Sequence, residues 1–414
     1  MPGRATCASR SVAATSSWSS RPLTVADLLL VLAALPLLVA TGYLCALALL
    51  ARRAAPPAER VPFTRFAVVV PAHDEEAGIA ATVASLLGVR YPRDRFRVVV
   101  VADNCTDGTA ARAAAAGAAV LERHDTERRG KGYALAHAFE RVLSEGWADA
   151  VVVVDADTLV SPNLLAAFDQ RFQAGALALQ AEYGVRNAEA SWRTRLMALA
   201  LALFHGVRSL ARERLLLSCG LRGNGMAFSA RVLRDVPHRA FSIVEDAEYG
   251  IALGLAGHRV VYVAEARVWG DMAATERTSR SQRQRWEGGR RDLVRRVVPE
   301  LLRRGWRERR ALLLDLAADL LVPPLATLVL AATLGSAVAA AAAVTGAARA
   351  GALAWIAVDA ALLVYVARGW VESRLGLAGL RDLLWAPVYV AWKLSLAFRG
   401  RSQEWVRTTR EGGA

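Results

Sequence analysis

Lysine and cysteine are scarce in this chain of 414 residues. Its only lysines are Lys131 and Lys393, so arginine supplies nearly all of the basic side chains behind the net charge of +14. The four cysteines are widely separated, form no CxxC pair and have no histidines at the spacing of a zinc motif. These absences argue against a disulfide framework and against a zinc cage. A lysine retained among so many arginines therefore draws attention.

The composition combines 54% hydrophobic residues with 22% charged residues. This mixture suits a soluble domain joined to membrane helices better than either part alone, and the length allows one sizeable α/β domain plus extra elements. A GC-rich genome is the simpler explanation for most of the arginines. A basic protein with strongly apolar segments nevertheless favours anionic lipid head groups and phosphorylated substrates as partners, and we expect no nucleic acid partner.

The N-terminal part predicts a tail followed by a membrane span. Residues 1–25 are rich in Ser, Ala and Arg without apolar periodicity, which indicates a disordered tail. Leu28 to Leu50 is an uncharged apolar run long enough to cross a bilayer, and Arg52 and Arg53 follow it. We therefore expect a transmembrane helix over 26–52. A cleaved signal peptide is the alternative, but its hydrophobic region would be too long.

A soluble α/β domain follows a short Pro-rich linker at 54–62. Strands and helices alternate from there to about residue 270, which predicts a βαβ sheet within a domain over 62–275. Each predicted strand is an apolar run without polar alternation, as expected for strands buried on both faces. The predicted strands are Phe66–Val70, Arg97–Ala102, Ala150–Asp155 and Ala176–Ala181.

The C-terminal part predicts further membrane-associated helices. Thirteen arginines lie between residues 277 and 310, so we expect interfacial helices over 276–312. The apolar segments Leu320–Ala348 and Ala350–Ala367 predict a hairpin of spans within a region over 313–398. The last apolar patch, Leu383–Phe398, is marginally long enough to cross, and we expect it to be interfacial or re-entrant before a tail over 399–414.

The distribution of arginine predicts the orientation in the membrane. Arg52, Arg53, Arg60 and Arg65 flank the first span on the side of the α/β domain. Because basic residues favour the cytosolic side, we expect a multi-pass protein of the cell membrane with a cytosolic catalytic domain and the N-terminal tail outside. The arginines of the tail disagree mildly with this orientation.

Two predicted strands deliver polar residues to one edge of the sheet. Pro71-Ala72-His73-Asp74-Glu75-Glu76 follows the first strand, and Asp103 follows the second. Ligands of open α/β sheets gather at the carboxyl ends of the strands. The alternatives are an ordinary turn with an aspartate as N-cap at residue 74, and turn chemistry in Asp-Asn-Cys-Thr-Asp-Gly.

Lys131 stands between two glycines just before a helical pattern. Glycines allow a close approach of the backbone, and the ammonium group can contact a diphosphate. A solvated basic turn is the alternative. The near absence of lysine elsewhere favours a function.

Asp155-Ala156-Asp157 follows the most apolar of the predicted strands directly. Two carboxylates one residue apart can hold a hard divalent cation that bridges a diphosphate. Burying two like charges without a cation would be costly. The position at a strand end therefore makes this motif more specific than a bare DxD sequence.

Two further motifs lie downstream. Glu245 and Asp246 precede a helical pattern, where a carboxylate can accept the proton of an acceptor hydroxyl; acids that stabilise a helix N-terminus are the alternative. Gln282, Arg285 and Trp286 fall at i, i+3 and i+4 and so share one helical face, which suits a diphosphate and a sugar. A basic helix on the membrane surface is the other interpretation, and both can hold.

In this order, the motifs resemble those of the membrane-associated family 2 glycosyltransferases, which include cellulose, chitin and hyaluronan synthases. The resemblance covers about residues 62–290 and rests on Asp155-Ala156-Asp157, Glu245-Asp246 and Gln282-x-x-Arg285-Trp286. It implies an α/β fold of the GT-A type, a Rossmann-like domain with a mostly parallel central sheet, flanked by transmembrane and interfacial helices.

The resemblance also implies the roles of individual residues. Those that would hold the nucleoside are the backbone of Pro71, Ala72 and His73 together with Glu75 and Asp103; the family often has Asn at the position of His73. Those that would serve the diphosphate and a divalent cation, Mg²⁺ or Mn²⁺, are Asp155 and Asp157, with Asp157 the direct metal ligand.

The acceptor side of the site follows from the same resemblance. Asp246 matches the general base, Glu245 shapes the acceptor site, and Gln282, Arg285 and Trp286 match the signature that contacts diphosphate and acceptor. The implied reaction is an inverting displacement that transfers a sugar from a nucleotide diphosphate sugar, expected to be UDP-linked, to a membrane-proximal lipid or glycan.

Two other functions stay open. A processive polysaccharide synthase needs a channel, and three or four spans make a thin one without membrane-protein partners or a homo-oligomer, so we favour single addition. The aspartates at 315, 319 and 359 lie near or within apolar segments and can line a polar path; for the first two, placement at the interface is the alternative. A non-catalytic scaffold that binds sugar nucleotides is the second possibility, and the intact acids argue against it.

Overall fold

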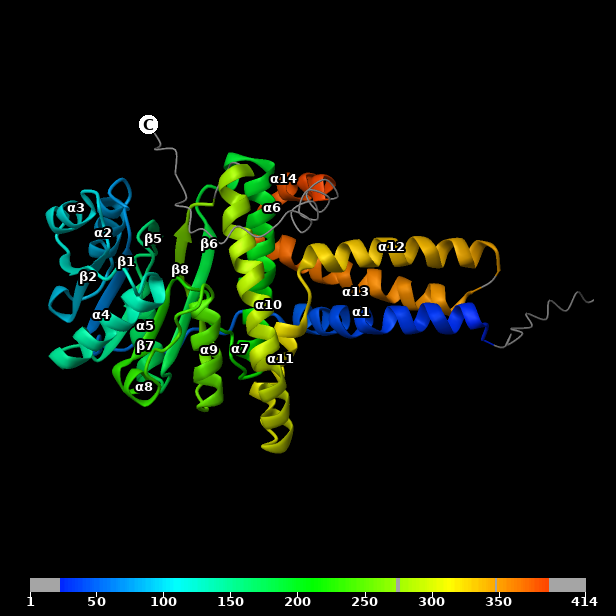
Figure 1. Ribbon diagram of the computed structural model, residues 1–414, viewed down its shortest axis with the longest axis horizontal. Coiled ribbons are helices and arrows are strands. Elements are labelled where there is room, and N and C mark those ends of the chain that lie inside the picture. The colour runs from blue at the N-terminus through cyan, green and yellow to red at the C-terminus, as the bar shows by residue number, and fades with distance from the viewer. Residues whose placement is uncertain (1–22, 273–275, 347, 387–414) are drawn as a thin grey trace, which may run out of the picture.

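The structure is a computed structural model that describes residues 23–272, 276–346 and 348–386; the side chains of 276–288 are not described. Figure 1 shows an α/β domain at one end and three long helices that extend together from the other end. Two helices, α6 and α10, cross between these parts. The expected arrangement of a sheet domain flanked by apolar helices is therefore present.

The α/β domain is built on an eight-stranded sheet in the order β3-β2-β1-β4-β7-β6-β8-β5. Its strands are β1 (Phe66–Ala72), β2 (Phe96–Asp103), β3 (Ala119–Arg123), β4 (Ala150–Val153), β5 (Thr158–Val160), β6 (Ala178–Val185), β7 (Met226–Ser229) and β8 (Val260–Gly270). The strands from β3 to β4 are parallel, as are β6 and β8, whereas β7 and β5 pair antiparallel with their neighbours. The expected mostly parallel sheet is confirmed.

The strand β1 lies at the centre of the parallel part and aligns the site. It pairs with β2 on one side and β4 on the other, with Phe66 opposite both Phe96 and Ala150. Nearly every residue of β1 is buried, because both faces of the sheet are covered. The carboxyl ends of the three strands consequently meet at one edge. The predicted strand at 150–155 ends earlier, at Val153, so Asp155 lies in the loop beyond it.

Helices alternate with these strands as predicted. They are α2 (Ile79–Leu87), α3 (Thr109–Ala115), α4 (Lys131–Glu145), α5 (Leu164–Gln173), α8 (Ala230–Asp235) and α9 (Glu245–Leu255), with short 3-10 turns η1 (Arg93–Arg95) and η2 (Ala188–Ala190). Glycines bound α4 at both ends: Gly130 precedes it with φ +120°, and Gly146 ends it in the left-handed conformation.

A continuous helical segment connects the sheet to the membrane bundle. It consists of α6 (Trp192–Leu201), the π-helical turn η3 (Ala202–Val207) and α7 (Arg208–Arg214). The long α10 (Glu276–Arg307) and α11 (Ala311–Leu321) cross the same region (Figure 1). The helix expected in the arginine-rich segment is therefore present. Pi-helical turns are rare and occur most often at functional sites.

Three described helices are long and apolar enough to cross a membrane: α1 (Val25–Leu50), α12 (Leu325–Val344) and α13 (Ala350–Ser373). The first span agrees with the predicted apolar run. The predicted start of the second span at Leu320 is wrong, because Leu320 belongs to α11 and Pro323 and Pro324 separate the two helices. The α14 helix (Gly376–Asp382) and the turn η4 (Leu383–Trp385) follow α13.

Hydrogen bonds join the spans at both ends of the bundle. At the end far from the sheet, the Asp27 carboxylate caps α1 and accepts a bond of 2.9 Å from the Gly351 amide. At the near end, the Arg368 guanidinium donates to the Ala51 carbonyl at 2.8 Å. The helices α12 and α13 thus form a hairpin beside α1, which returns the chain to the side of the α/β domain (Figure 1).

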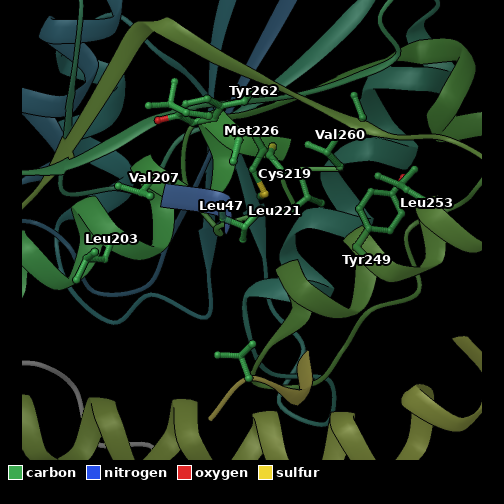
Figure 2. Packing of buried hydrophobic residues seen from close by; sticks show 14 of the residues in the cluster. Leu47, Leu203, Val207, Cys219, Leu221, Met226, Tyr249, Leu253, Val260 and Tyr262 are labelled. Carbon is green, nitrogen blue, oxygen red and sulfur yellow. The ribbon is translucent and has the colours of Figure 1, made fainter. Parts of the chain in front are cut away.

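One hydrophobic core runs from the sheet into the membrane bundle. Leu47 of α1, Leu203 and Val207 of η3 and Met226 of β7 belong to one hydrophobic cluster, part of which Figure 2 shows. Residues of the same cluster continue along α1 and α13, including Ala34 and Trp355. The α/β domain and the three apolar helices are therefore packed against each other.

Candidate active site

The centre of the site is the ammonium group of Lys131, the first residue of α4. Its Nζ atom donates to Asp155 Oδ1 at 2.5 Å and to the Gly223 carbonyl at 2.5 Å, and lies 3.7 Å from Glu245 Oε1. Burial alone lowers the pKa of Lys131, but Asp155 and Glu245 outweigh it and raise the pKa above the ordinary value. Asp155 and Glu245, two predicted site residues far apart in the sequence, are thus brought together around the positive charge of Lys131, which is a third.

Gly132, next to Lys131, allows a close backbone approach as expected, and the segment approached belongs to the chain itself. A Cβ atom on Gly132 would overlap the backbone carbonyl of Ala240, so this glycine allows α4 to approach the loop before α9. The Tyr133 ring stacks on Phe241 of the same loop, with ring centroids 4.2 Å apart. The close approach therefore positions Lys131 against the acids of α9.

Glu245 and Asp246 occupy the first turn of α9. Burial is the main cause that raises the pKa of Glu245 to about 7; Lys131 opposes the shift and Asp246 adds to it. Burial likewise raises the pKa of Asp246, against the hydrogen bond from the Ala247 amide and the charge of Lys131. Both acids also lie where a helix N-terminus stabilises negative charge, so the two interpretations hold together.

A loop that sequence analysis missed completes this side of the site. The segment 219–225 precedes β7 and contains Gly220, Gly223 and Gly225, all with positive φ. A Cβ atom on Gly223 would lie 3.4 Å from Asp246 Oδ2 and 3.5 Å from Lys131 Nζ, so this backbone lies close to both the acid and the lysine. The sequence signal that could have identified this loop is the presence of three glycines within six residues, at 220–225, together with Arg222 and Asn224.

Asn224 and Thr158 connect the two acids of the Asp-x-Asp motif by hydrogen bonds. Asn224 is fully buried; its Oδ1 atom accepts from the Asp155 amide at 3.1 Å and its side-chain nitrogen donates to Thr158 Oγ1 at 2.7 Å. The Thr158 hydroxyl also donates to Asp157 Oδ1 at 3.3 Å. Burial is the main cause that raises the pKa of Tyr183, and the charges of Asp155 and Asp157 add to it, so both carboxylates lie near one ring.

The expected nucleoside contacts lie at the carboxyl ends of β1 and β2. Ala72 pairs with Ala102, which sets the His73 ring beside Asp103: its Nδ1 atom lies 2.7 Å from the Asp103 carbonyl. The Asp103 carboxylate is 6% exposed, and its Oδ1 atom accepts from Arg123 Nη1 at 2.6 Å and from the Asn104 side chain at 3.2 Å. Sequence analysis missed Arg123, whose partner is 20 residues away.

The remaining residues of the loop after β1 form hydrogen bonds that stabilise this loop. Pro71, the residue before Ala72 in β1, is half-buried. The Glu75 amide donates to Thr109 Oγ1 at 2.8 Å, and its carbonyl accepts from the start of α2. Asp74 has φ +54° and accepts from the Thr106 amide at 2.7 Å, so it is not an N-cap. The helix begins instead after Gly78, without a side-chain cap.

Asp74, Cys105 and Asp107 also place three potential metal-ligating atoms within 4.8 Å of one another. Backbone amides already bond to both carboxylates: Thr106 to Asp74, and Glu76 and Thr109 to Asp107. This set differs from the predicted Asp155 and Asp157. Its hydrogen bonds explain it as the scaffold of the loops after β1 and β2.

Gln282, Arg285 and Trp286 lie within α10, so their expected helical backbone is present. Their side chains lie outside the described residues. At Gly289, the next described residue, a Cβ atom would overlap Ile243 and would meet Val244 at 3.1 Å. The motif therefore continues into a part of α10 that packs against the segment before Glu245 and Asp246.

Two comparisons with curated proteins give moderate similarity. Beta-monoglucosyldiacylglycerol synthase of Synechocystis sp. is 29% identical over 56% of this chain and 49% of its own length. Probable glucomannan 4-beta-mannosyltransferase 3 of Oryza sativa subsp. japonica is 24% identical over 59% of this chain and 46% of its own. The chain thus spans about half the length of these curated relatives.

A solved structure shares the fold over nearly the whole chain. The mannosyltransferase PcManGT from Pyrobaculum calidifontis, in complex with GDP-Man and Mn²⁺, superposes with a TM-score of 0.53 and 21% identity, covering 88% of this chain and 99% of that one. The family model described as "Glycosyltransferase like family 2" matches residues 63–289, more than half of the chain. The chain belongs to this glycosyltransferase family.

Proposed function

We propose that the protein is an inverting glycosyltransferase that transfers a sugar from a nucleotide diphosphate sugar, UDP-linked, to a lipid or glycan acceptor at the membrane. One observation carries the proposal: Lys131 contacts Asp155 and approaches Glu245, while Gly223 lies close to both Lys131 and Asp246. The donor-side acids and the acid proposed as base therefore share one site, as a displacement at one carbon requires.

The Asp-x-Asp residues fit a divalent cation. Asp155 and Asp157 offer carboxylate oxygens near one tyrosine, and such hard oxygen donors suit Mg²⁺ or Mn²⁺. We assign Asp157 as the direct ligand, since Asp155 already pairs with Lys131. A bound cation would supply charge stabilisation to the departing nucleoside diphosphate.

Asp246 acts as the base in this proposal. Its carboxylate accepts the proton of the acceptor hydroxyl while the hydroxyl oxygen bonds to the anomeric carbon and the bond to the diphosphate oxygen breaks. Attack from the face opposite the leaving group inverts the configuration, so an α-linked donor gives a β-linked product. Lys131 keeps Asp155 in place and balances the charge of Glu245 throughout.

The membrane bundle supports a membrane-proximal acceptor. The three apolar helices share one hydrophobic core with the α/β domain, which holds the site beside the bilayer. The relatives differ on this point, because one is named for a glycolipid and the other for a polysaccharide. Three described spans make a thin channel for a polymer, so we favour addition of a single sugar.

The test uses the full-length protein in lipid nanodiscs with radiolabelled nucleotide sugars and Mn²⁺ or Mg²⁺. We expect donor-dependent labelling of a lipid or glycan that a chelator abolishes and added cation restores. Product sizing then separates the mechanisms, since one labelled band means single addition and a ladder means a polymer. A scaffold would bind the donor without consuming it, and that result would refute the proposal.

Asp246→Asn tests the assignment of the base. We expect donor binding to stay within about 3-fold while transfer falls by about 10²- to 10⁴-fold, because the amide cannot accept the proton. Isothermal titration with the nucleoside diphosphate and transfer assays measure the two effects. Asp235→Asn on the exposed part of α8 is the matched control. Normal turnover in Asp246→Asn would remove the assignment.

A further inference from the structure

A group of three arginines lies beside the proposed base: Arg208 and Arg212 are buried and Arg222 is half-buried. Arg212 contacts Asp315 and Asp319, each at 2.8 Å, and Arg208 contacts Asp319 at 3.0 Å. The third guanidinium, that of Arg222, has no carboxylate within 4.0 Å among the described residues. Three guanidinium groups thus have two carboxylates at salt-bridge distance, and a charge that is partly withdrawn from water without a partner is unfavourable.

Arg222 and His205 each leave a buried nitrogen without a partner. The Arg222 guanidinium donates to the Cys219 carbonyl at 2.8 Å and covers the Phe204 ring at 4.1 Å, but its Nε atom has no hydrogen-bond partner in the described part of the chain. His205 is 8% exposed, and its Nδ1 atom is equally unpartnered. Unpaired buried polar atoms are rare in folded proteins and indicate a missing ligand or water.

These two residues lie close to each other and to the site. The Arg222 and Arg208 guanidinium carbons lie 4.1 Å and 5.0 Å from the centroid of the Phe204 ring, and the His205 ring lies 5.3 Å from that ring, which places the three side chains in one neighbourhood. Arg222 directly precedes Gly223, whose backbone lies against the Asp246 carboxylate. His205 belongs to the π-helical turn η3. An acceptor group held here would lie next to the base.

The same neighbourhood adjoins the membrane spans. Arg208 donates from Nε to the Tyr365 hydroxyl of α13 at 2.9 Å. A Cβ atom on Gly206 would lie 3.2 Å from Glu372, also of α13. The cations therefore lie at the end of the bundle where it meets the α/β domain, the level at which phospholipid head groups are found.

We propose that Arg222 and His205 bind the phosphate of the acceptor, which is a phospholipid whose head group carries both a phosphate and a free hydroxyl. This inference rests on the proposed function and names its acceptor class. The guanidinium fork matches phosphate oxygens, and the phosphate supplies the negative charge that the third guanidinium lacks. With the phosphate at Arg222, a hydroxyl a few bonds away reaches Asp246.

The experiment compares acceptors that separate phosphate from hydroxyl. Full-length protein in phosphatidylcholine nanodiscs receives labelled donor and either diacylglycerol, which has only the hydroxyl, or phosphatidylglycerol or phosphatidylinositol, which have both groups. We expect kcat/KM for the anionic lipids to exceed that for diacylglycerol by about 10- to 100-fold. Equal or better use of diacylglycerol would overturn the proposal. Equal use of soluble glycerol 3-phosphate would overturn its lipid part.

Variants show whether the phosphate is bound at the proposed residues. Arg222→Gln should raise KM for the anionic lipid by about 10- to 100-fold, and should raise KM for diacylglycerol by much less, because diacylglycerol has no phosphate to lose. Arg222→Lys should restore part of the loss, and His205→Gln should give a smaller one. Arg214→Gln, at the exposed end of α7, is the matched control. An unchanged KM in Arg222→Gln would contradict the assignment.

A binding assay separates this inference from the proposed function. Detergent-purified wild type, Arg222→Gln and Arg214→Gln are compared for retention of radiolabelled phosphatidylglycerol. If no variant transfers sugar but only Arg222→Gln loses the lipid, the anion site stands and the transferase proposal fails. If all three proteins retain the lipid equally, the anion site is refuted whatever the enzyme does.

Discussion

At the scale of single residues, Lys131 determines how the acidic groups of the site coexist. Its ammonium is shared by Asp155 and the Gly223 carbonyl and lies near Glu245. Without this charge, the carboxylates of Asp155, Glu245 and Asp246 would lie close together in a largely buried site, where like charges are unfavourable. The lysine is thus part of the architecture of the site as well as a candidate contact for the diphosphate.

Lys131→Met removes that charge while keeping most of the side-chain volume. We expect transfer to fall by about 10²- to 10³-fold, because the acids lose a preorganised donor and Glu245 becomes harder to ionise. Transfer rates at saturating donor measure the loss. Lys393→Met, at the only other lysine of the chain, is the matched control. Equal activity of the two variants would show that Lys131 has no part in the reaction.

The acids of α9 predict a pH dependence. Because burial raises the pKa of Glu245 to about 7, the pair binds a proton below that pH and releases it above. The proposed base must be ionised, so kcat/KM should rise as the pH increases through about 7. Glu245→Gln removes the neighbouring acid and should move the midpoint to lower pH. A midpoint unchanged by Glu245→Gln would separate the profile from this pair.

The same shift has an opposite sign for stability. The folded protein holds the Glu245 proton more tightly than the unfolded chain, whose glutamate has an ordinary pKa. The contribution of this group to the free energy of unfolding is therefore largest at acidic pH and is lost as the pH rises to about 7. The site thus gains its ionised base at the expense of stability.

Sequence motifs identified the acids of the site but not the residues that hold them. Asp155 stood out because it follows an apolar strand, Lys131 because it stands between glycines, and Glu245 because it precedes a helical pattern; the structure brings them together. Arg123 and Asn224 escaped notice because their roles depend on partners 20 and 69 residues away. Such pairings depend on the order of strands in the sheet, which local patterns do not encode.

At the scale of elements, the start of α4 depends on how closely its backbone approaches another segment. Gly132→Ala would place a methyl group against the Ala240 carbonyl. The atoms that it would meet are backbone atoms, so no flexible side chain can move aside. We expect destabilisation by about 1–3 kcal/mol together with reduced transfer, because Lys131 shifts with the helix. Thermal unfolding and transfer assays measure both effects.

Gly78→Ala is the control for that substitution. A Cβ atom there would lie 3.7 Å from the Ala156 carbonyl, an ordinary contact distance, at the N-cap of another helix of the same domain. We expect nearly unchanged unfolding in this variant. Equal stability of Gly132→Ala and Gly78→Ala would show that α4 moves freely relative to the loop before α9.

Elements were predictable where a strong apolar pattern covered their whole length. The buried strands β1, β2 and β4 and the span α1 belong to this class, whereas the strand predicted at Ala176–Ala181 covers only the first half of β6, whose second half is only partly buried. The strands β5 and β7 have only three and four residues, too few to show a period. The two prolines that separate α11 from α12, Pro323 and Pro324, are present in the sequence. The apolar run continues on both sides of them, so the run was predicted as one span.

At the scale of the whole molecule, Asp315 and Asp319 join the catalytic domain to the membrane bundle. Both pair with Arg212, and Asp315 accepts a bond of 2.7 Å from the Tyr43 hydroxyl of α1. They lie in α11, outside the three candidate spans, so interface placement explains them better than a polar path. Asp359, in contrast, lies within α13 and bonds to Ser336 of α12 at 2.7 Å.

The fold of the bundle makes the predicted orientation testable with one protease. Arg60, in the exposed linker after α1, lies on the domain side, whereas Arg349 is exposed at the opposite end, where α12 turns into α13. Since the arginines beside the domain favour the cytosol, trypsin should cut at Arg60 only in inside-out vesicles and at Arg349 only in right-side-out vesicles. Mass spectrometry of the fragments identifies each cut. The reversed pattern would place the catalytic domain outside, away from cytosolic nucleotide sugars. Cleavage of both sites from one side would mean that α12 and α13 do not cross the bilayer as a hairpin beside α1.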